Sequence, residues 1–195
     1  MNNEQLLQMY DAIRQQPDLL VKAAARKRLI NFARYMQPDL VLEPFHVVYY
    51  TLLDMFAHGK IRKMIVQQPP QHGKSEGWSR KLPAFMLGLD PDRKICIGSY
   101  AATIARDFNR DVQRIIDTPQ YRELFPGTYL NGSNVVTMAN TYLRNSDVIE
   151  MVGRKGSLRV VGRGGSLTSK TVDVSILDDV YKDYAEGNSP IVRAA

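Results

Sequence analysis

The most constraining feature of this sequence is the stretch 63–78, in which a short apolar run leads into a Gly-Lys-Ser tripeptide. The apolar run 64–66 predicts a buried strand of a parallel sheet, and the residues after Ser75 are compatible with a helix. This order of strand, loop and helix is the context in which Gly-Lys-Ser binds phosphate, because backbone N–H groups at a helix N-terminus point at the anion. We therefore predict a phosphate-binding loop. The alternative is a Pro-Pro turn followed by a basic, solvated helix start.

The residues of this loop have defined expected roles. Lys74 would reach the β- and γ-phosphates of ATP, and the Ser75 hydroxyl would bind Mg²⁺. Other candidates for contact with the nucleotide precede this pair in the loop: Gln68, Pro70, Gln71, His72 and Gly73. The general pattern has a glycine five residues before the second one, and Gln68 stands at that position here.

A second signal lies at 172–179, where an apolar run ends in two adjacent carboxylates. In phosphate-loop enzymes a strand beside the loop ends in an aspartate that binds Mg²⁺, so we assign Asp178 to the metal. The following carboxylate, Asp179, can orient or deprotonate the attacking water as a general base. The alternative is that the two residues only begin a turn, which we would prefer if the loop upstream were missing. Asp173, earlier in the run, is expected to be structural.

The remaining sequence predicts an α/β fold in which strands and helices alternate. Helices are expected in the N-terminal region at 4–15, 18–36 and 44–58, and later at 75–88, 101–117 and 118–125. Pro83 should kink or split the helix at 75–88. Besides 64–66 and 172–179, a strand is expected at 94–99, and a small antiparallel excursion at 134–139, 147–152 and 157–161.

Composition narrows the class of protein. The 195 residues, 44% of them hydrophobic, suffice for a domain with a core, and the single cysteine, Cys96, excludes an internal disulfide and suits the cytoplasm. The net charge of +6 favours polyanion partners such as nucleic acid, with basic clusters at 22–28, 59–63 and 153–163 that could equally be solvated surface. Neither a membrane span nor a signal peptide is expected.

These residues together resemble the ATPase domain of the terminase large subunits of tailed phages and prophages, the motors that package DNA. The resemblance covers most of the chain, and its most specific part is the loop from Pro69 to Ser75. Further matching segments are 32–38, His46, Gly59-Lys60, Ser79-Arg80, Pro83-Ala84, Leu87-Gly88, Ser99-Tyr100, 124–126, 162–167 and 176–179.

The resemblance implies an α/β P-loop NTPase of the ASCE type, with a mainly parallel sheet flanked by helices. It implies Mg²⁺-dependent hydrolysis of ATP, coupled to translocation of double-stranded DNA into a procapsid in the host cytoplasm. The implied partners are a portal protein, a small terminase subunit and further copies of the chain in a ring. We expect a helical region at 1–60 packed on an ATPase core at 61–195.

The chain departs from the family pattern in three ways. Gln71 stands where many members have an arginine, so an arginine finger would come from a neighbouring subunit or from one of four residues here: Arg80, Arg106, Arg154 and Arg163. The catalytic glutamate usually follows the metal aspartate directly, where Asp179 stands, while Glu186 lies seven residues further on; the choice stays open. Only sixteen residues follow Asp179, so the expected ATPase core is incomplete and the nuclease domain is absent.

Two alternatives to the packaging motor remain at this stage. One is another P-loop motor that acts on nucleic acid, such as a helicase. The other is a fragment that binds nucleotide or DNA without turnover of its own.

Overall fold

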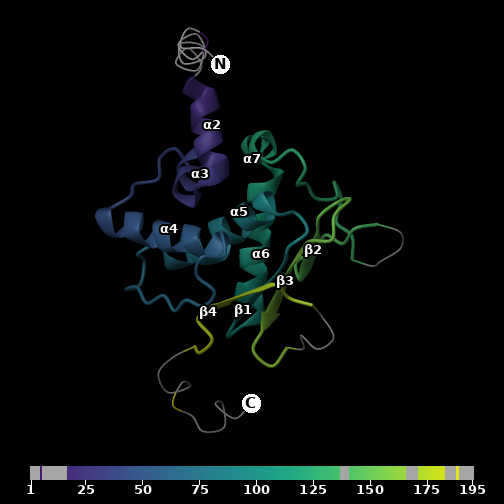
Figure 1. The fold of residues 1–195 in the computed structure, drawn as a ribbon. Coiled ribbons are helices and arrows are strands. Elements are labelled where there is room, and N and C mark those ends of the chain that lie inside the picture. The colour runs from purple at the N-terminus through teal and green to yellow at the C-terminus, as the bar shows by residue number, and fades with distance from the viewer. Residues whose placement is uncertain (1–4, 6–16, 137–140, 166–170, 183–187, 189–195) are drawn as a thin grey trace.

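One mixed sheet organises the part of the chain that the computed structural model describes, namely residue 5, residues 17–136, 141–165 and 171–182, and residue 188. Its strands are β1 (Lys94–Ser99), β2 (Val148–Glu150), β3 (Ser157–Gly162) and β4 (Val174–Asp178). They lie in the order β2-β3-β1-β4, as Figure 1 shows. β1 pairs in parallel with both β3 and β4, and only β2 is antiparallel to its neighbour β3.

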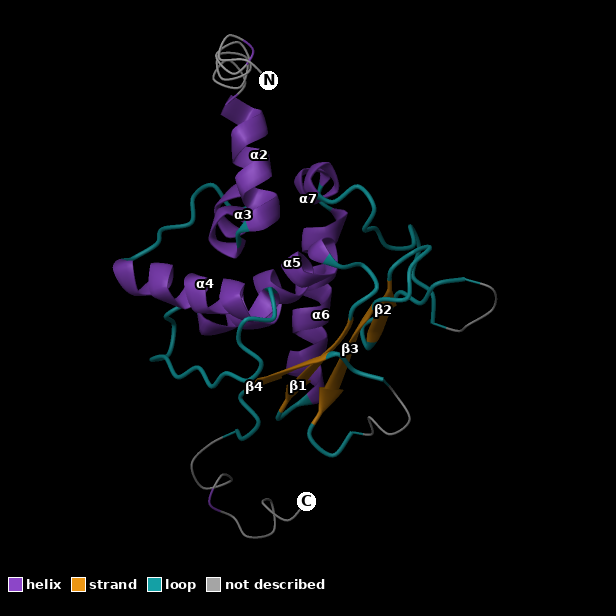
Figure 2. Cartoon of the chain, viewed as in Figure 1, coloured by secondary structure: helices purple, strands orange, loops and turns teal. Residues whose placement is uncertain are grey.

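The helices gather on one side of this sheet (Figure 2). They are α2 (Pro17–Lys27), α3 (Leu29–Met36), α4 (Pro44–Ala57), the π-helix η1 (Glu76–Lys81), α5 (Leu82–Leu89), α6 (Ala102–Asp117) and α7 (Pro119–Leu124). α6 packs on β1 and β3, and η1 packs on β4. The strands are apolar on this face, where Ile97 of β1 lies beside Ile176 of β4 and both side chains are buried. On the other face of β4 the side chain of Leu177 stays exposed.

Aromatic side chains join the N-terminal helices to the rest of the core. The ring of Phe32 in α3 lies within 5.4–6.1 Å of the rings of Phe85, Tyr121 and Phe125. The buried hydroxyl of Tyr121 donates to the carbonyl of Ala84 at 2.8 Å. One continuous apolar core therefore spans both regions.

A break at Arg28 divides the helix that was expected at 18–36 into α2 and α3. Arg28 is extended, and its side chain does not cap α3. The buried carboxylate of Asp54 in α4 takes that role, because it accepts from the N–H of Leu29 at 2.8 Å and pairs with Arg28 at 3.1 Å. The break thus depends on a partner 25 residues away, which local periodicity does not reveal.

The strand expected at 64–66 is wrong for this structure. This run is not paired with any strand, and the side chain of Ile65 is 90% exposed. Within the described residues β4 pairs with β1 alone. The run has three residues, and Pro69-Pro70 follow it shortly after. Because proline has no N–H group, this segment could form few hydrogen bonds with a neighbouring strand.

Other boundaries are partly confirmed. The helix expected at 75–88 is present as η1 followed without a break by α5, and Pro83 is accommodated in the first turn of α5. The separate antiparallel excursion is wrong in part, because β3 belongs to the main sheet and only its pairing with β2 is antiparallel. Of the strand expected at 134–139, Val135 forms an isolated bridge with Arg144, and 137–140 lie outside the described residues. The helix expected at 4–15 also lies outside them, apart from Gln5.

Candidate functional site

The two strongest signals of the sequence meet in space. The ammonium group of Lys74 lies 2.9 Å from Oδ1 of Asp178 and 2.5 Å from Oδ1 of Asp179. The backbone becomes helical at Lys74 and stays helical through η1 and α5, whereas Asp178 ends β4. A lysine at a helix N-terminus is therefore held between two carboxylates at the carboxyl end of a parallel strand, the place where ligand sites of α/β sheets form.

Asp178 is a buried carboxylate with an incomplete set of partners. Its side chain is 2% exposed, and its Oδ2 accepts from the Ser79 hydroxyl at 2.7 Å. Burial alone would raise the pKa of Asp178, but hydrogen bonds from Ser79, Lys74 and Ser75 outweigh burial and hold this pKa below its usual value. Oδ1 has the distance of an ion pair to Lys74 but no aligned hydrogen bond. This oxygen is buried and has Lys74 as its neighbour at 2.9 Å.

The oxygens at this point fit Mg²⁺. Hard cations of this kind bind carboxylate and hydroxyl oxygens, and Mg²⁺ is commonly held by one or two carboxylates together with substrate phosphates. The Asp178 carboxylate and the Ser75 hydroxyl, which interact in this structure, form such a pair. The described residues contain no group of three or more His, Cys, Asp or Glu side chains placed for a metal.

Asp179 is held in an unusual backbone conformation. Its φ of +46° lies in the left-handed region that few residues other than glycine adopt. Its carbonyl accepts from the N–H of Tyr100 at 3.0 Å, which ties the end of β4 to the end of β1. Its side chain is 64% exposed beyond Lys74. Strain of this kind clusters at functional sites, which agrees with a role for Asp179.

The loop before Lys74 makes a tight turn with two left-handed residues, Gln71 at φ +62° and Gly73 at φ +77°. A Cβ at position 73 would lie in ordinary contact with the His46 ring at 3.5 Å, so the positive φ rather than lack of space accounts for glycine here. His72 turns back to the Pro70 carbonyl, 2.8 Å from its Nδ1. The loop residues predicted from sequence thus lie together.

Helix α4 packs against this loop. The hydroxyl of Tyr49 donates to the Lys74 carbonyl at 2.6 Å, and its ring fills the space where Gly77 has no side chain. Phe45, one turn earlier in α4, lies with its ring 5.7 Å from that of His72. Sequence reasoning assigned no site role to Tyr49, which lies 25 residues before Lys74 and carries no motif. Ser79 had a usable signal, because a residue four after Ser75 lies on the same helix face.

Gln68 and Glu186 complete the set of predicted site residues. The side-chain oxygen of Gln68 is buried and has no hydrogen-bond partner among the described residues. Glu186 lies outside the described residues, so its competition with Asp179 stays a prediction.

The candidate arginine fingers differ in their placement. Arg80 pairs with Asp111 at 2.7 Å, and Arg106 pairs with Asp147 at 2.6 Å, so both are engaged elsewhere. Arg163 follows β3, and its N–H donates to the carbonyl of Ser99 at 2.9 Å. Since Ser99 stands beside Asp178 in the register of the sheet, the backbone of Arg163 lies at the same carboxyl edge as the site.

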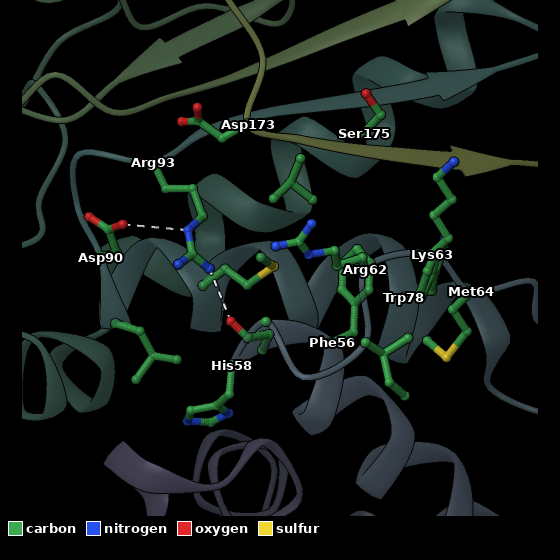
Figure 3. Close-up of a pocket in the computed structure, with 16 residues that line it drawn as sticks. Phe56, His58, Arg62, Lys63, Met64, Trp78, Asp90, Arg93, Asp173 and Ser175 are labelled. Atoms are coloured by element: carbon green, nitrogen blue, oxygen red, sulfur yellow. Dashed lines mark hydrogen bonds and ion pairs between the residues drawn. The ribbon is translucent and has the colours of Figure 1, made fainter.

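A large cavity of the described structure is separate from this cluster. It holds about 1090 Å³ and lies near the start of β4, where Asp173, Ser175, Trp78 and Arg93 contribute to its wall (Figure 3). Arg93 is engaged there with Asp90 and with a backbone carbonyl. Asp173 accepts from the Lys94 N–H at 2.8 Å, which confirms its structural role.

Comparison with known proteins finds no match to this chain. No family model matches the chain, and neither do the curated proteins or the solved structures with which it was compared. Among the described residues no helix has both the length and the apolar character needed to cross a membrane.

Proposed function

We propose that this chain is the Mg²⁺-dependent ATP-hydrolysing domain of a viral DNA-packaging motor of the terminase large-subunit type. The observation that carries the proposal is the contact of Lys74 with Asp178 and Asp179, at a helix N-terminus and at the end of a parallel strand. These are the residue types and positions that phosphoryl transfer requires in P-loop enzymes. The resemblance of the sequence to terminases extends the proposal from an ATPase to a packaging motor.

In this proposal each residue of the cluster has a separate task. The N–H groups at the helix start and the Lys74 ammonium bind the phosphates, and Ser75 with Asp178 would hold Mg²⁺. When bound, the ion neutralises charge on the β- and γ-phosphates. Asp179, or Glu186 in its place, orients the attacking water and accepts its proton.

The ion pairs of Lys74 describe the site before nucleotide binds. Lys74 is 24% exposed and its partner Asp179 is 64% exposed. Solvent or a phosphate group can therefore readily replace Asp179 as the partner of Lys74. Asp178 is buried and needs a cation after Lys74 turns away, which is the role proposed for Mg²⁺. The binding of ATP and of Mg²⁺ should therefore be coupled through Asp178.

The partners of the motor follow from the resemblance. They are double-stranded DNA, a portal protein, a small terminase subunit and copies of the chain in a ring. The basic cluster at 59–63 agrees with contact to DNA phosphates, because Lys60, Arg62 and Lys63 have no ion pair among the described residues. Binding to DNA should weaken steeply with salt and should be indifferent to base sequence; a flat salt response would reject this part of the proposal.

The decisive experiment compares Mg²⁺-ATP binding and hydrolysis by the chain and by Lys74→Ala, with and without double-stranded DNA. A matched control is Lys22→Ala, because Lys22 also pairs with two carboxylates, Asp18 and Glu123, at 2.7 Å each. We expect binding and hydrolysis to be lost in Lys74→Ala and kept in Lys22→Ala. Equal ATP binding by all three proteins would refute the phosphate loop. Binding that depends on Lys74 but brings no hydrolysis, with or without DNA, would leave a nucleotide-binding fragment and refute turnover.

A further inference from the structure

Helix α4 exposes an apolar face on the side that does not pack on the core. The face consists of Phe45, Val48, Leu52 and Met55, which are 41%, 61%, 40% and 36% exposed. The opposite side of the helix is buried. Because helices that are apolar all round are normally covered, this face predicts a partner. In Figure 1 the N-terminal part of α4 extends away from the other labelled elements, which leaves room for one.

The spacing of this face fits another helix. Its residues follow each other at intervals of three, four and three positions, the pattern of the a and d sites in a helix seam. No charged side chain interrupts it, since the only formal charge within α4, on Asp54, is buried on the opposite side. A partner helix would therefore meet an uninterrupted apolar surface.

The same face is complementary to itself when two copies run antiparallel. A two-fold axis at position 50 places Phe45 opposite Met55 of the other copy, because the two numbers lie five before and five after the axis. It also places Val48 opposite Leu52, two before and two after. Each a site then meets a d site, so all four apolar residues are matched by one symmetric register.

The charges at the two ends of α4 favour the same orientation. The acidic residues Asp39 and Glu43 precede the helix, and the basic cluster at 59–63 follows it. In the antiparallel pair the acidic end of one copy lies beside the basic end of the other, and the two helix dipoles oppose each other. A parallel pair would place like charges together.

We propose that α4 docks on α4 of a second copy of this chain, antiparallel about a two-fold axis. The inference goes beyond the proposed function and does not depend on it. Such a contact is isologous and closes as a dimer, so it differs from the heterologous contacts that build a ring. Phe45 also packs against His72 of the loop, so Val48 and Leu52 are the better positions for a test.

The test compares two double variants of the whole chain by sedimentation over a range of concentrations, with circular dichroism as the check of folding. Val48→Glu with Leu52→Glu brings four carboxylates together in the antiparallel pair and should weaken dimerisation at least about 100-fold. Val48→Glu with Leu52→Lys instead pairs opposite charges across the axis and should keep the dimer. Leu20→Glu, on the half-exposed face of α2, is a control that should leave the dimer of the native chain unchanged.

Each outcome decides the proposal. A native dimer of about 44 kDa, twice the 22.1 kDa of the chain, that is lost in the first variant and kept in the second supports it. A native chain that stays monomeric up to roughly 100 μM, a range in which weak specific contacts are populated, overturns it. So does a dimer that survives both glutamates, and so does a dimer lost equally in both variants, which would exclude the antiparallel register.

Discussion

Replacement of Lys74 by methionine should destabilise the chain even in the absence of nucleotide. Methionine keeps most of the apolar stem and removes the ammonium group, so the buried carboxylate of Asp178 loses its only cation among the described residues. Breaking a buried ion pair costs about 3–5 kcal/mol. Ser75 and Ser79 still donate to the carboxylate, and Lys74 is partly exposed, so we expect a smaller loss of about 2–3 kcal/mol in the free energy of unfolding.

Asp179→Asn provides the matched comparison. This change removes the other carboxylate that contacts Lys74, but that carboxylate is 64% exposed. An exposed pair contributes at most about 1 kcal/mol, so the cost should be clearly smaller than that of Lys74→Met.

The dependence on pH follows from the directions of the two pKa shifts. Interactions in the folded state lower the pKa of Asp178, so its contribution to stability is present above its unfolded value of 3.8 and is lost as the pH falls through the folded value. They raise the pKa of Lys74 despite its burial, so its contribution is present below 10.5 and is lost as the pH rises through the folded value. The difference between the native chain and Lys74→Met should be constant between these limits and shrink beyond each of them.

Urea unfolding followed by tryptophan fluorescence measures these effects, because the single tryptophan, Trp78, lies in η1 directly after the loop. A loss of about 2–3 kcal/mol corresponds to a fall of about 1–1.5 M in the midpoint, for a slope of about 2 kcal/mol per M. Equal midpoints for Lys74→Met and Asp179→Asn would refute the argument from burial. A difference that persists unchanged below about pH 3 would refute the role of the Asp178 carboxylate.

Three further predictions concern the supports of the site. Asp54→Ala leaves the buried N–H of Leu29 without its acceptor and should cost about 1–3 kcal/mol, measured by urea unfolding. Gly77→Ala places a methyl group 2.6 Å from the buried Tyr49 ring and should cost about 1–3 kcal/mol; a smaller loss when Tyr49→Leu is also present would confirm the clash. Removal of Mg²⁺ should weaken ATP binding by the native chain about 10–100-fold in calorimetry and should weaken it less in Asp178→Asn, because in that variant the ion offsets the phosphate charge but no buried carboxylate.

The sequence predicted the centre of the site because that centre depends on the ends of regular elements. Lys74 and Asp179 are 105 positions apart, yet each follows a pattern that local sequence displays, a Gly-Lys-Ser tripeptide and an apolar run that ends in carboxylates. Asp178 lies at the carboxyl edge of the parallel strands as expected, whereas the run expected as a strand before Lys74 is unpaired, so only the helix start at Lys74 matches the predicted context of the loop. The sequence also predicted β1, β4 and α6, because each has a residue pattern that can be seen locally.

The supports of the site could not be predicted because their partners lie far away in sequence and carry no pattern. Tyr49 contacts the Lys74 carbonyl because α4 packs against the loop. Asp54 belongs to α4 but caps the N-terminus of α3. The run 64–66 has strand composition but no paired neighbour, which shows that β propensity is decided by the partner rather than by the run.

The charges of the cluster explain why one lysine can serve both states of the proposed enzyme. Before nucleotide binds, Lys74 pairs with two carboxylates, and together with the hydrogen bonds from Ser79 and Ser75 it holds the pKa of the buried Asp178 below its usual value. ATP would bring further negative charge, so Lys74 could turn toward the phosphates only if another cation replaced it at Asp178. An ion held by Asp178 and Ser75 meets that need, and the unaligned Oδ1 of Asp178 is the oxygen that would receive it. In the proposed enzyme, the burial of one carboxylate would therefore contribute to the demand for Mg²⁺.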